Sequence, residues 1–179
     1  MKKTVVVGAS ENTERYSNQA ILMLRERNMP VVAIGIKEGK VFEAPEKALP
    51  EELFPPCIKL ILNGLDDGRK RALFILINYF TSIGWDYDMI EKRLREWNAK
   101  NREPLRDVYL IGQLRYHKQM QKKILPPNCD NEMYMVGIGV HRLCDELHKK
   151  GIKNPAQYTL RKARLMNREK VKIKNERIQ

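Results

Sequence analysis

Strand-forming patterns occur only near the start of this 179-residue chain. The runs Thr4–Val7 and Val31–Ile34 are short, apolar and rich in β-branched residues, as buried parallel strands are. Between them, Ala20 and Leu24 have helical spacing, and Ser17 is a candidate N-cap. Two parallel strands do not form a stable sheet by themselves. Most of the hydrophobic core must therefore come from helices.

A charged, proline-containing segment at residues 37–56 separates this βαβ unit from a region of helical periodicity. The run Ala72–Ile77 lies in a helix that is apolar nearly all round, which predicts the core helix. We expect a mainly α fold with a small N-terminal α/β (βαβ) unit at residues 1–48, a helical domain at 49–165 and a basic tail at 166–179. Helices are expected at Cys57–Leu65, about Arg69–Ile83, Tyr87–Trp97, from Pro104 through Leu114, at Val140–Lys149 and from Pro155, with Asn154 as its cap.

The chain is basic, with a net charge of +12, and the excess is concentrated at its end. From Thr159 onward there are eight basic and two acidic residues. Such a positive potential favours polyanions, so nucleic acid is an expected partner, with a merely solvated basic face as the alternative. The apolar runs Val5–Ala9 and Ala72–Ile77 are too short for a secretory signal or a bilayer span. We expect a cytoplasmic protein without a membrane partner.

Cysteine and histidine residues form a candidate metal site. On one helix, His141, Cys144 and His148 would lie within about 60° of each other. Cys57 stands at an expected helix start, which favours a thiolate, and Cys129 follows a rigid turn. Thiolates with imidazoles suit zinc, and thiolates suit iron–sulfur clusters. The residues predict a metal-linked helical domain and leave zinc and iron–sulfur open; inert burial of the cysteines is the alternative.

Short segments of the helical region occur in an order known from one family. They are Pro55–Cys57, Gly68–Arg69, Leu125–Cys129, Gly137–Val140 and Ile152–Pro155. Together they make the chain from about Phe54 to Lys162 resemble the C-terminal iron–sulfur domain of archaeal and eukaryotic DNA primase large subunits. The resemblance implies a non-catalytic subunit of a nucleotidyltransferase complex. Such a module would hold a DNA or RNA template and the 5′ triphosphate of the primer, beside a separate catalytic primase subunit.

The resemblance also implies a 4Fe–4S cluster held by four cysteines. Cys57 and Cys129 match the first two of these. His141 stands where the third is expected, and His148 stands near the fourth, with Cys144 between them. Three cysteines with one histidine could hold a cluster, whereas two of each would form a zinc site.

Two basic clusters are candidate nucleic-acid and phosphate contacts. Arg69 matches a basic position of the primase family, and Lys70 and Arg71 extend the charge at the same helix start, where backbone amides also attract phosphate. In the second cluster, at residues 115–117, aromatic and basic side chains alternate in a way that suits base stacking. An ordinary basic surface is the alternative for both. The second cluster consists of Arg115, Tyr116 and His117.

The N-terminal segment has a pattern of its own. Val6–Ser10 ends a strand with a glycine turn, and Val32–Gly35 closes the βαβ unit. Residues 3–39 thereby resemble the opening of the small coenzyme-A-binding Rossmann-type family. The resemblance implies coenzyme A as a cofactor and makes a small coenzyme-A- or nucleotide-binding protein the alternative function; a βαβ cap that binds nothing is a further alternative. The expected cofactor-binding residues are Gly8, Ala9, Ser10, Asn12, Arg15 and Tyr16.

Overall fold

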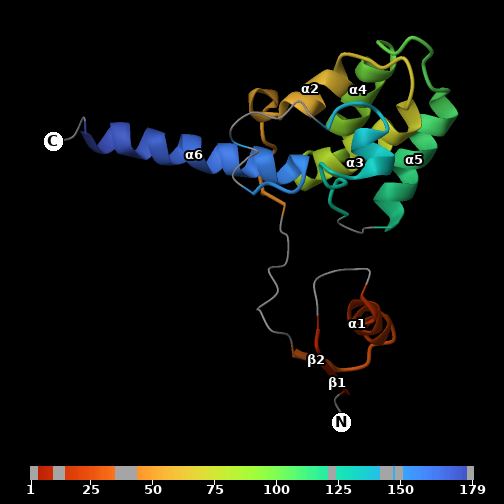
Figure 1. Ribbon diagram of the computed structural model, residues 1–179, viewed down its shortest axis with the longest axis vertical. Helices are drawn as coiled ribbons and strands as arrows, with labels where there is room; N and C mark the ends of the chain where they lie inside the picture. The colour runs from red at the N-terminus through yellow and green to blue at the C-terminus, as the bar shows by residue number, and fades with distance from the viewer. Residues whose placement is uncertain are drawn as a thin grey trace. The chain divides into compact units, whose positions relative to one another are not determined.

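In a computed structural model of the protein, residues 4–9, 15–34, 44–120, 124–141, 147 and 151–176 are described, with the side chains of the last helix described through Glu169 (Figure 1). By its internal contacts the chain divides into two units, Met1–Phe42 and Glu43–Gln179. Each unit is described below by itself.

The N-terminal unit is the expected βαβ arrangement. Strand β1 (Thr4–Val7) pairs in parallel with β2 (Val31–Ile34), so that Val7 lies opposite Ile34. Helix α1 (Tyr16–Glu26) connects them. Among the described residues of this unit, none is buried. The unit therefore has little apolar burial to stabilise it, as expected for a two-stranded sheet.

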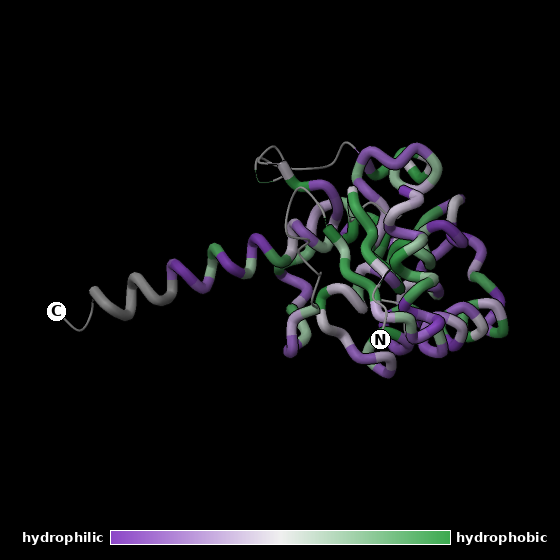
Figure 2. Tube along the Cα trace, turned by 90° about the horizontal axis from the view of Figure 1, so that it is seen from below, coloured by the Kyte–Doolittle hydropathy of each residue, from purple (hydrophilic) through white to green (hydrophobic). Residues whose placement is uncertain are grey.

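The second unit is helical and is built around one buried helix. This helix, α3 (Arg69–Ser82), contacts α4, α5 and α6 as well as the π-helical turn η2. Its middle is apolar on all sides, and Figure 2 shows such apolar segments inside the bundle. A sequence of this kind is stable only when neighbours cover every face. The other helical segments are η1 (Glu51–Leu53), α2 (Pro56–Leu62), α4 (Tyr87–Asn98), α5 (Asp107–Met120), η2 (Glu132–Val136) and α6 (Pro155–Glu176).

Aromatic rings fill the part of the core beside α2 and α3. Phe54 packs edge-on against Tyr79, with ring centroids 5.1 Å apart. Phe80 stacks on Trp85 at 4.6 Å. Such pairs add about 0.5–1.5 kcal/mol each to the gain from burial alone. The core thus joins the segment before α2 to the last turn of α3 and the residues after it.

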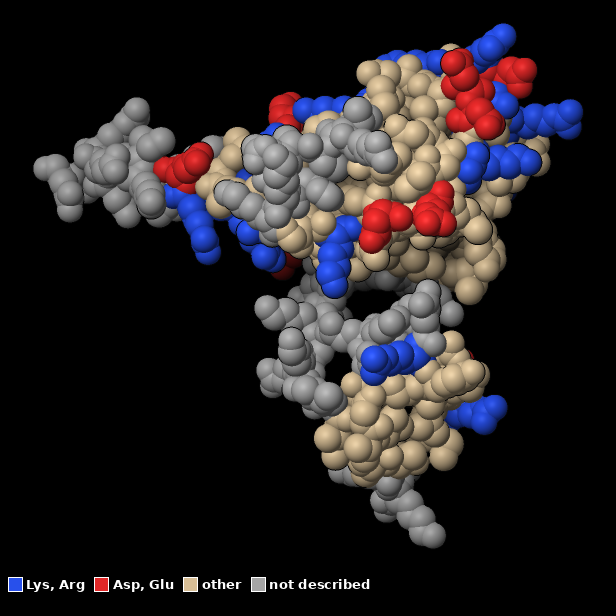
Figure 3. Space-filling view, viewed as in Figure 1, with Lys and Arg blue, Asp and Glu red and all other residues tan. Residues whose placement is uncertain are grey.

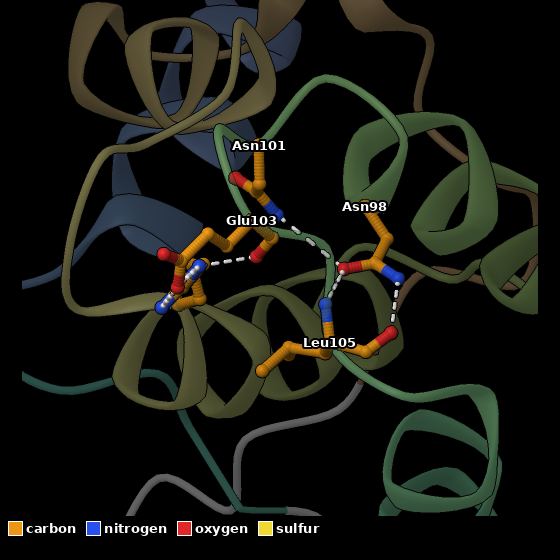
Figure 4. A network of polar contacts seen from close by, with 5 residues as sticks. Asn98, Asn101, Glu103 and Leu105 are labelled. Atoms are coloured by element: carbon orange, nitrogen blue, oxygen red, sulfur yellow. Dashed lines mark hydrogen bonds and ion pairs between the residues drawn. The ribbon is translucent and has the colours of Figure 1, made fainter.

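Three asparagines hold the turns between the helices, and two of them, Asn98 and Asn101, are drawn in Figure 4. The buried Asn98 accepts a hydrogen bond from the Leu105 amide and donates one to the Leu105 carbonyl, both at 2.8 Å. Asn101 accepts from the Leu65 amide, also at 2.8 Å. Asn154 caps α6 by accepting from the Gln157 amide at 3.0 Å. These contacts satisfy backbone groups that would otherwise be buried without partners.

Several boundaries differ from expectation. Ser17 lies inside α1 and does not cap it, because the helix already begins at Tyr16 after Arg15. Helix α5 starts at Asp107, three residues after Pro104, because the Leu105 backbone is bonded to Asn98 instead. The helix expected from Val140 does not include Val140 or His141, and of the residues after these to Lys149 only Leu147, in a turn, is described. In contrast, α6 continues well into the expected tail.

Helix α6 is the longest described helix, and much of it is charged. Across the described parts of the chain, no helix combines the length and apolarity that crossing a membrane requires.

Candidate functional site

The turn after β1 is the first candidate site. Gly8 has φ +77°, and a Cβ at this position would meet nothing within 4 Å. The Ala9 amide donates to the Ile34 carbonyl at 3.0 Å, which places the turn at the carboxyl ends of both strands. Ligands of parallel sheets bind at this edge. Two other predicted contacts, Ser10 and Asn12, lie outside the described residues.

The start of α1 lies beyond this turn and carries no acidic residue in its first turn. Its N-cap is Arg15, whose side chain makes no capping bond. Both Arg15 and Tyr16 are exposed, Tyr16 by 90%. A helix start without a side-chain cap or a carboxylate has unsatisfied amides and a positive dipole end, which suit an anionic group.

The predicted metal ligands are only partly brought together. Cys129 and His141 line one cavity of about 420 Å³, together with Asp130. Cys57 is 1% exposed and belongs to the hydrophobic core near Tyr79. Within the described ranges, no group of three or more His, Cys, Asp or Glu side chains is arranged to hold a metal ion. The other two predicted ligands, Cys144 and His148, fall outside those ranges, so the iron–sulfur or zinc centre has no support from the described residues.

The basic start of α3 is engaged in contacts within the protein. Both terminal nitrogens of Arg69 lie 3.1 Å from Oε2 of Glu103, and Arg69 also contacts the Glu103 carbonyl. Arg71 donates to the Met133 carbonyl at 3.2 Å. Lys70 lies 5.3 Å from the centre of the Tyr109 ring. A phosphate would compete with these contacts, and the role of this cluster in nucleic-acid binding stays a prediction.

At the end of α5, the second basic cluster contains a hydrogen-bonded chain. His117 Nε2 lies 2.8 Å from Asn78 Oδ1, and His117 Nδ1 lies 3.0 Å from the Tyr87 hydroxyl. Because Asn78 Nδ2 donates to the Phe74 carbonyl, Asn78 Oδ1 must accept. The proton of His117 is therefore on Nε2, and Tyr87 donates to Nδ1. We call Tyr87–His117–Asn78 the polar relay.

Burial lowers the pKa of His117 and so favours the neutral imidazole, which accepts from the Tyr87 hydroxyl in the polar relay. Burial also raises the pKa of Tyr87, so its hydroxyl keeps the proton that it donates. Arg115 and Tyr116 beside it are exposed. Sequence reasoning singled out His117 but missed Asn78 and Tyr87. A buried asparagine in an apolar helix was the available signal, because such a side chain needs partners.

The relay makes stability depend on pH. The folded state keeps His117 neutral below its usual pKa of about 6.5, where the unfolded chain binds a proton. The contribution of neutral His117 to the free energy of unfolding is therefore present above pH ~6.5. It is lost as the pH falls through the lower pKa that His117 has in the folded state. In urea titrations, the loss of stability between pH 7 and 5 should be smaller for His117→Gln, which cannot titrate. An equal loss in both proteins would contradict this assignment.

Comparison with known proteins concerns the N-terminal part of the chain. Residues 2–61 match the family model described as CoA binding domain. This is about a third of the chain, and it contains both strands and α1. No curated protein and no solved structure matches the chain, and no comparison supports the resemblance to primase large subunits. The N-terminal third is thus similar to CoA-binding domains of the Rossmann type.

Proposed function

We propose that the protein binds coenzyme A, or a nucleotide that shares its pyrophosphate group, at the turn between β1 and α1. The observation that carries the proposal is the family match at residues 2–61, which contains the Gly8 turn. The backbone geometry of the Gly8 turn agrees with this match, because its positive φ leaves the backbone open to a ligand.

The residues present fit a pyrophosphate. The open space beside Gly8 lets a phosphate approach the backbone closely, which a side chain would prevent. The amides at the start of α1, to which the Arg15 side chain gives no capping bond, can donate to phosphate oxygens, and Arg15 adds a positive charge beside them. β1 and β2 pair in parallel, and α1 contacts both strands. This arrangement binds and orients a ligand.

Arg15→Glu tests the proposal by reversing the charge at the site. Hydrogen bonds to charged groups contribute about 1.5–3 kcal/mol, so the Kd for coenzyme A should rise about tenfold or more. Isothermal titration calorimetry measures this directly. A carboxylate at the start of α1 is favourable for the helix dipole. Weaker binding would therefore not result from unfolding of α1.

Arg25→Glu is the matched control, because Arg25 is exposed in the last turn of the same helix and gives the same change in charge. Its Kd should stay within about twofold of the unaltered protein, since the dipole and phosphate effects fall off within one turn. ADP in place of coenzyme A shows whether the nucleotide part suffices. Equal losses in both variants, or no binding of either ligand, would refute the proposal.

A further inference from the structure

We propose that α6 binds the phosphate backbone of a double-stranded nucleic acid through a row of arginines on its outer face. Arg161, Arg164 and Arg168 follow each other at spacings of three and four residues. At ~100° per residue they lie within about 60° of one another, and they extend about 10 Å along the helix axis. We call these three residues the α6 stripe.

The rotation of α6 in the bundle presents the α6 stripe to solvent. Thr159, on the opposite side of the helix, is fully buried, and its hydroxyl lies 2.8 Å from the Tyr79 hydroxyl. Ala156 on that same side is also fully buried. All members of the α6 stripe are exposed. The buried hydrogen bond to α3 therefore fixes which face of α6 remains outside.

The buried residues of α6 lie in its first part. This part packs against η1 and α3, whereas every described side chain from Arg164 to Glu169 is exposed. The helix itself continues to Glu176 and extends past the other helices of its unit (Figures 1 and 2). An isolated helix as short as the segment from Arg164 to Glu176 is only marginally stable in water, so a binding partner along this segment would stabilise it.

The charges of two members of the α6 stripe are not neutralised by an ion pair among the described residues. The ion pairs found there involve Arg69, Arg71, Arg93 and Arg95, but neither Arg164 nor Arg168. Like charges three or four residues apart destabilise a helix by about 0.2–0.5 kcal/mol per pair. The helix dipole favours basic residues only in the last turn, which lies further on. A polyanion would remove this repulsion.

Several features favour duplex nucleic acid as the occupant. Arginine forms paired hydrogen bonds with phosphate oxygens, and a row of cations matches a row of phosphates. Single strands are usually held by stacked aromatic side chains, and residues 161–179 contain none. Membrane-surface helices need a wide apolar face. In the described part of α6, the exposed large apolar side chains are only Leu165 and Met166, each 41% exposed. Figure 3 shows basic side chains along this part of the helix.

The test measures binding of the full chain to a fluorescein-labelled 20-base-pair DNA duplex, and to the same duplex as RNA, by anisotropy between 50 and 200 mM KCl. Replacing all members of the α6 stripe by glutamine keeps helix propensity nearly unchanged. Each phosphate contact contributes about 0.9 to the slope of log K against log salt for duplex DNA. We expect the slope to become shallower by about 2–3 and affinity at 100 mM KCl to fall at least 30-fold.

The control is a triple variant that combines Lys92→Gln, Arg102→Gln and Arg106→Gln. These residues are exposed and lie elsewhere on the helical unit. Their replacement gives the same total change in charge as the α6-stripe variant. In this control variant, the slope of log K against log salt should change by less than about a third of the change expected for the α6-stripe variant. Equal effects of the two triple variants would overturn the proposal, because binding would then depend on net charge alone.

Sedimentation with phosphatidylserine-containing vesicles is the second arm. If the α6-stripe variant lost vesicle binding while its duplex binding stayed unchanged, the proposal would also be overturned. Far-UV circular dichroism verifies that both variants are folded.

Discussion

Gly64→Ala is expected to lower the free energy of unfolding by about 3 kcal/mol or more. Gly64 has φ +101°, a conformation that alanine adopts only with strain. A Cβ there would lie 2.3 Å from the Lys100 carbonyl oxygen and 2.8 Å from its carbon. Both are backbone atoms, which cannot rotate away. The turn between α2 and α3 and the end of α4 would have to separate, and urea denaturation followed by tryptophan fluorescence measures the cost.

The same change at another glycine, Gly112→Ala, is expected to raise the free energy of unfolding. Gly112 lies within α5 and is exposed, and a Cβ there would meet nothing within 4 Å. Alanine is the better helix former by about 0.5–1 kcal/mol, so this variant should be more stable than the unaltered protein. Shifts of equal sign and size in the two variants would contradict the packing described for the α2–α3 turn.

Asn98→Ala should lower the free energy of unfolding by about 2–4 kcal/mol, because it leaves the amide and the carbonyl of Leu105 without their partner. Asn98 is 5% exposed, so water cannot easily replace the lost hydrogen bonds. The segment between α4 and α5 would lose its anchor. Urea denaturation at pH 7, read by the same fluorescence signal, measures the effect.

Asn63→Ala is the matched control for this second variant. Asn63 is exposed at the end of α2, so its removal should change stability by no more than about 0.5 kcal/mol. If Asn98→Ala were equally mild, the amide of Asn98 would not be holding the turn. The polar contacts in Figure 4 would then be incidental to the fold.

Local pattern was sufficient for most of the helical architecture. Within the expected helix Tyr87–Trp97, the residues Ile90, Leu94 and Trp97 have the spacing of one helix face, and all three are fully buried. Proline at the start of α6 and asparagine before it marked the helix start correctly. These signals act within a few residues, and the periodicity of a helix is itself local. The same holds for the strands, whose β-branched runs identified both.

Contacts between distant residues could not be predicted in this way. The partner of Arg69 is Glu103, and the partners of His117 are Asn78 and Tyr87, all more than twenty-five positions away. Whether a basic side chain is exposed or paired depends on how the loops bring such positions together. For this reason the sequence predicted nucleic-acid contacts both for Arg69, through the primase resemblance, and for the end of α5, through its aromatic and basic residues, although their surroundings differ.

The order of strands and helices, the glycine turn after β1 and the basic excess of the last helix were all determined by the amino-acid sequence, because each depends on neighbouring residues. Tertiary structure alone decided which charges are neutralised and which face outward. The buried hydrogen bond between Tyr79 and Thr159 orients α6 and leaves its arginines in solvent. That orientation results from packing across eighty positions of chain, and no local pattern contains it.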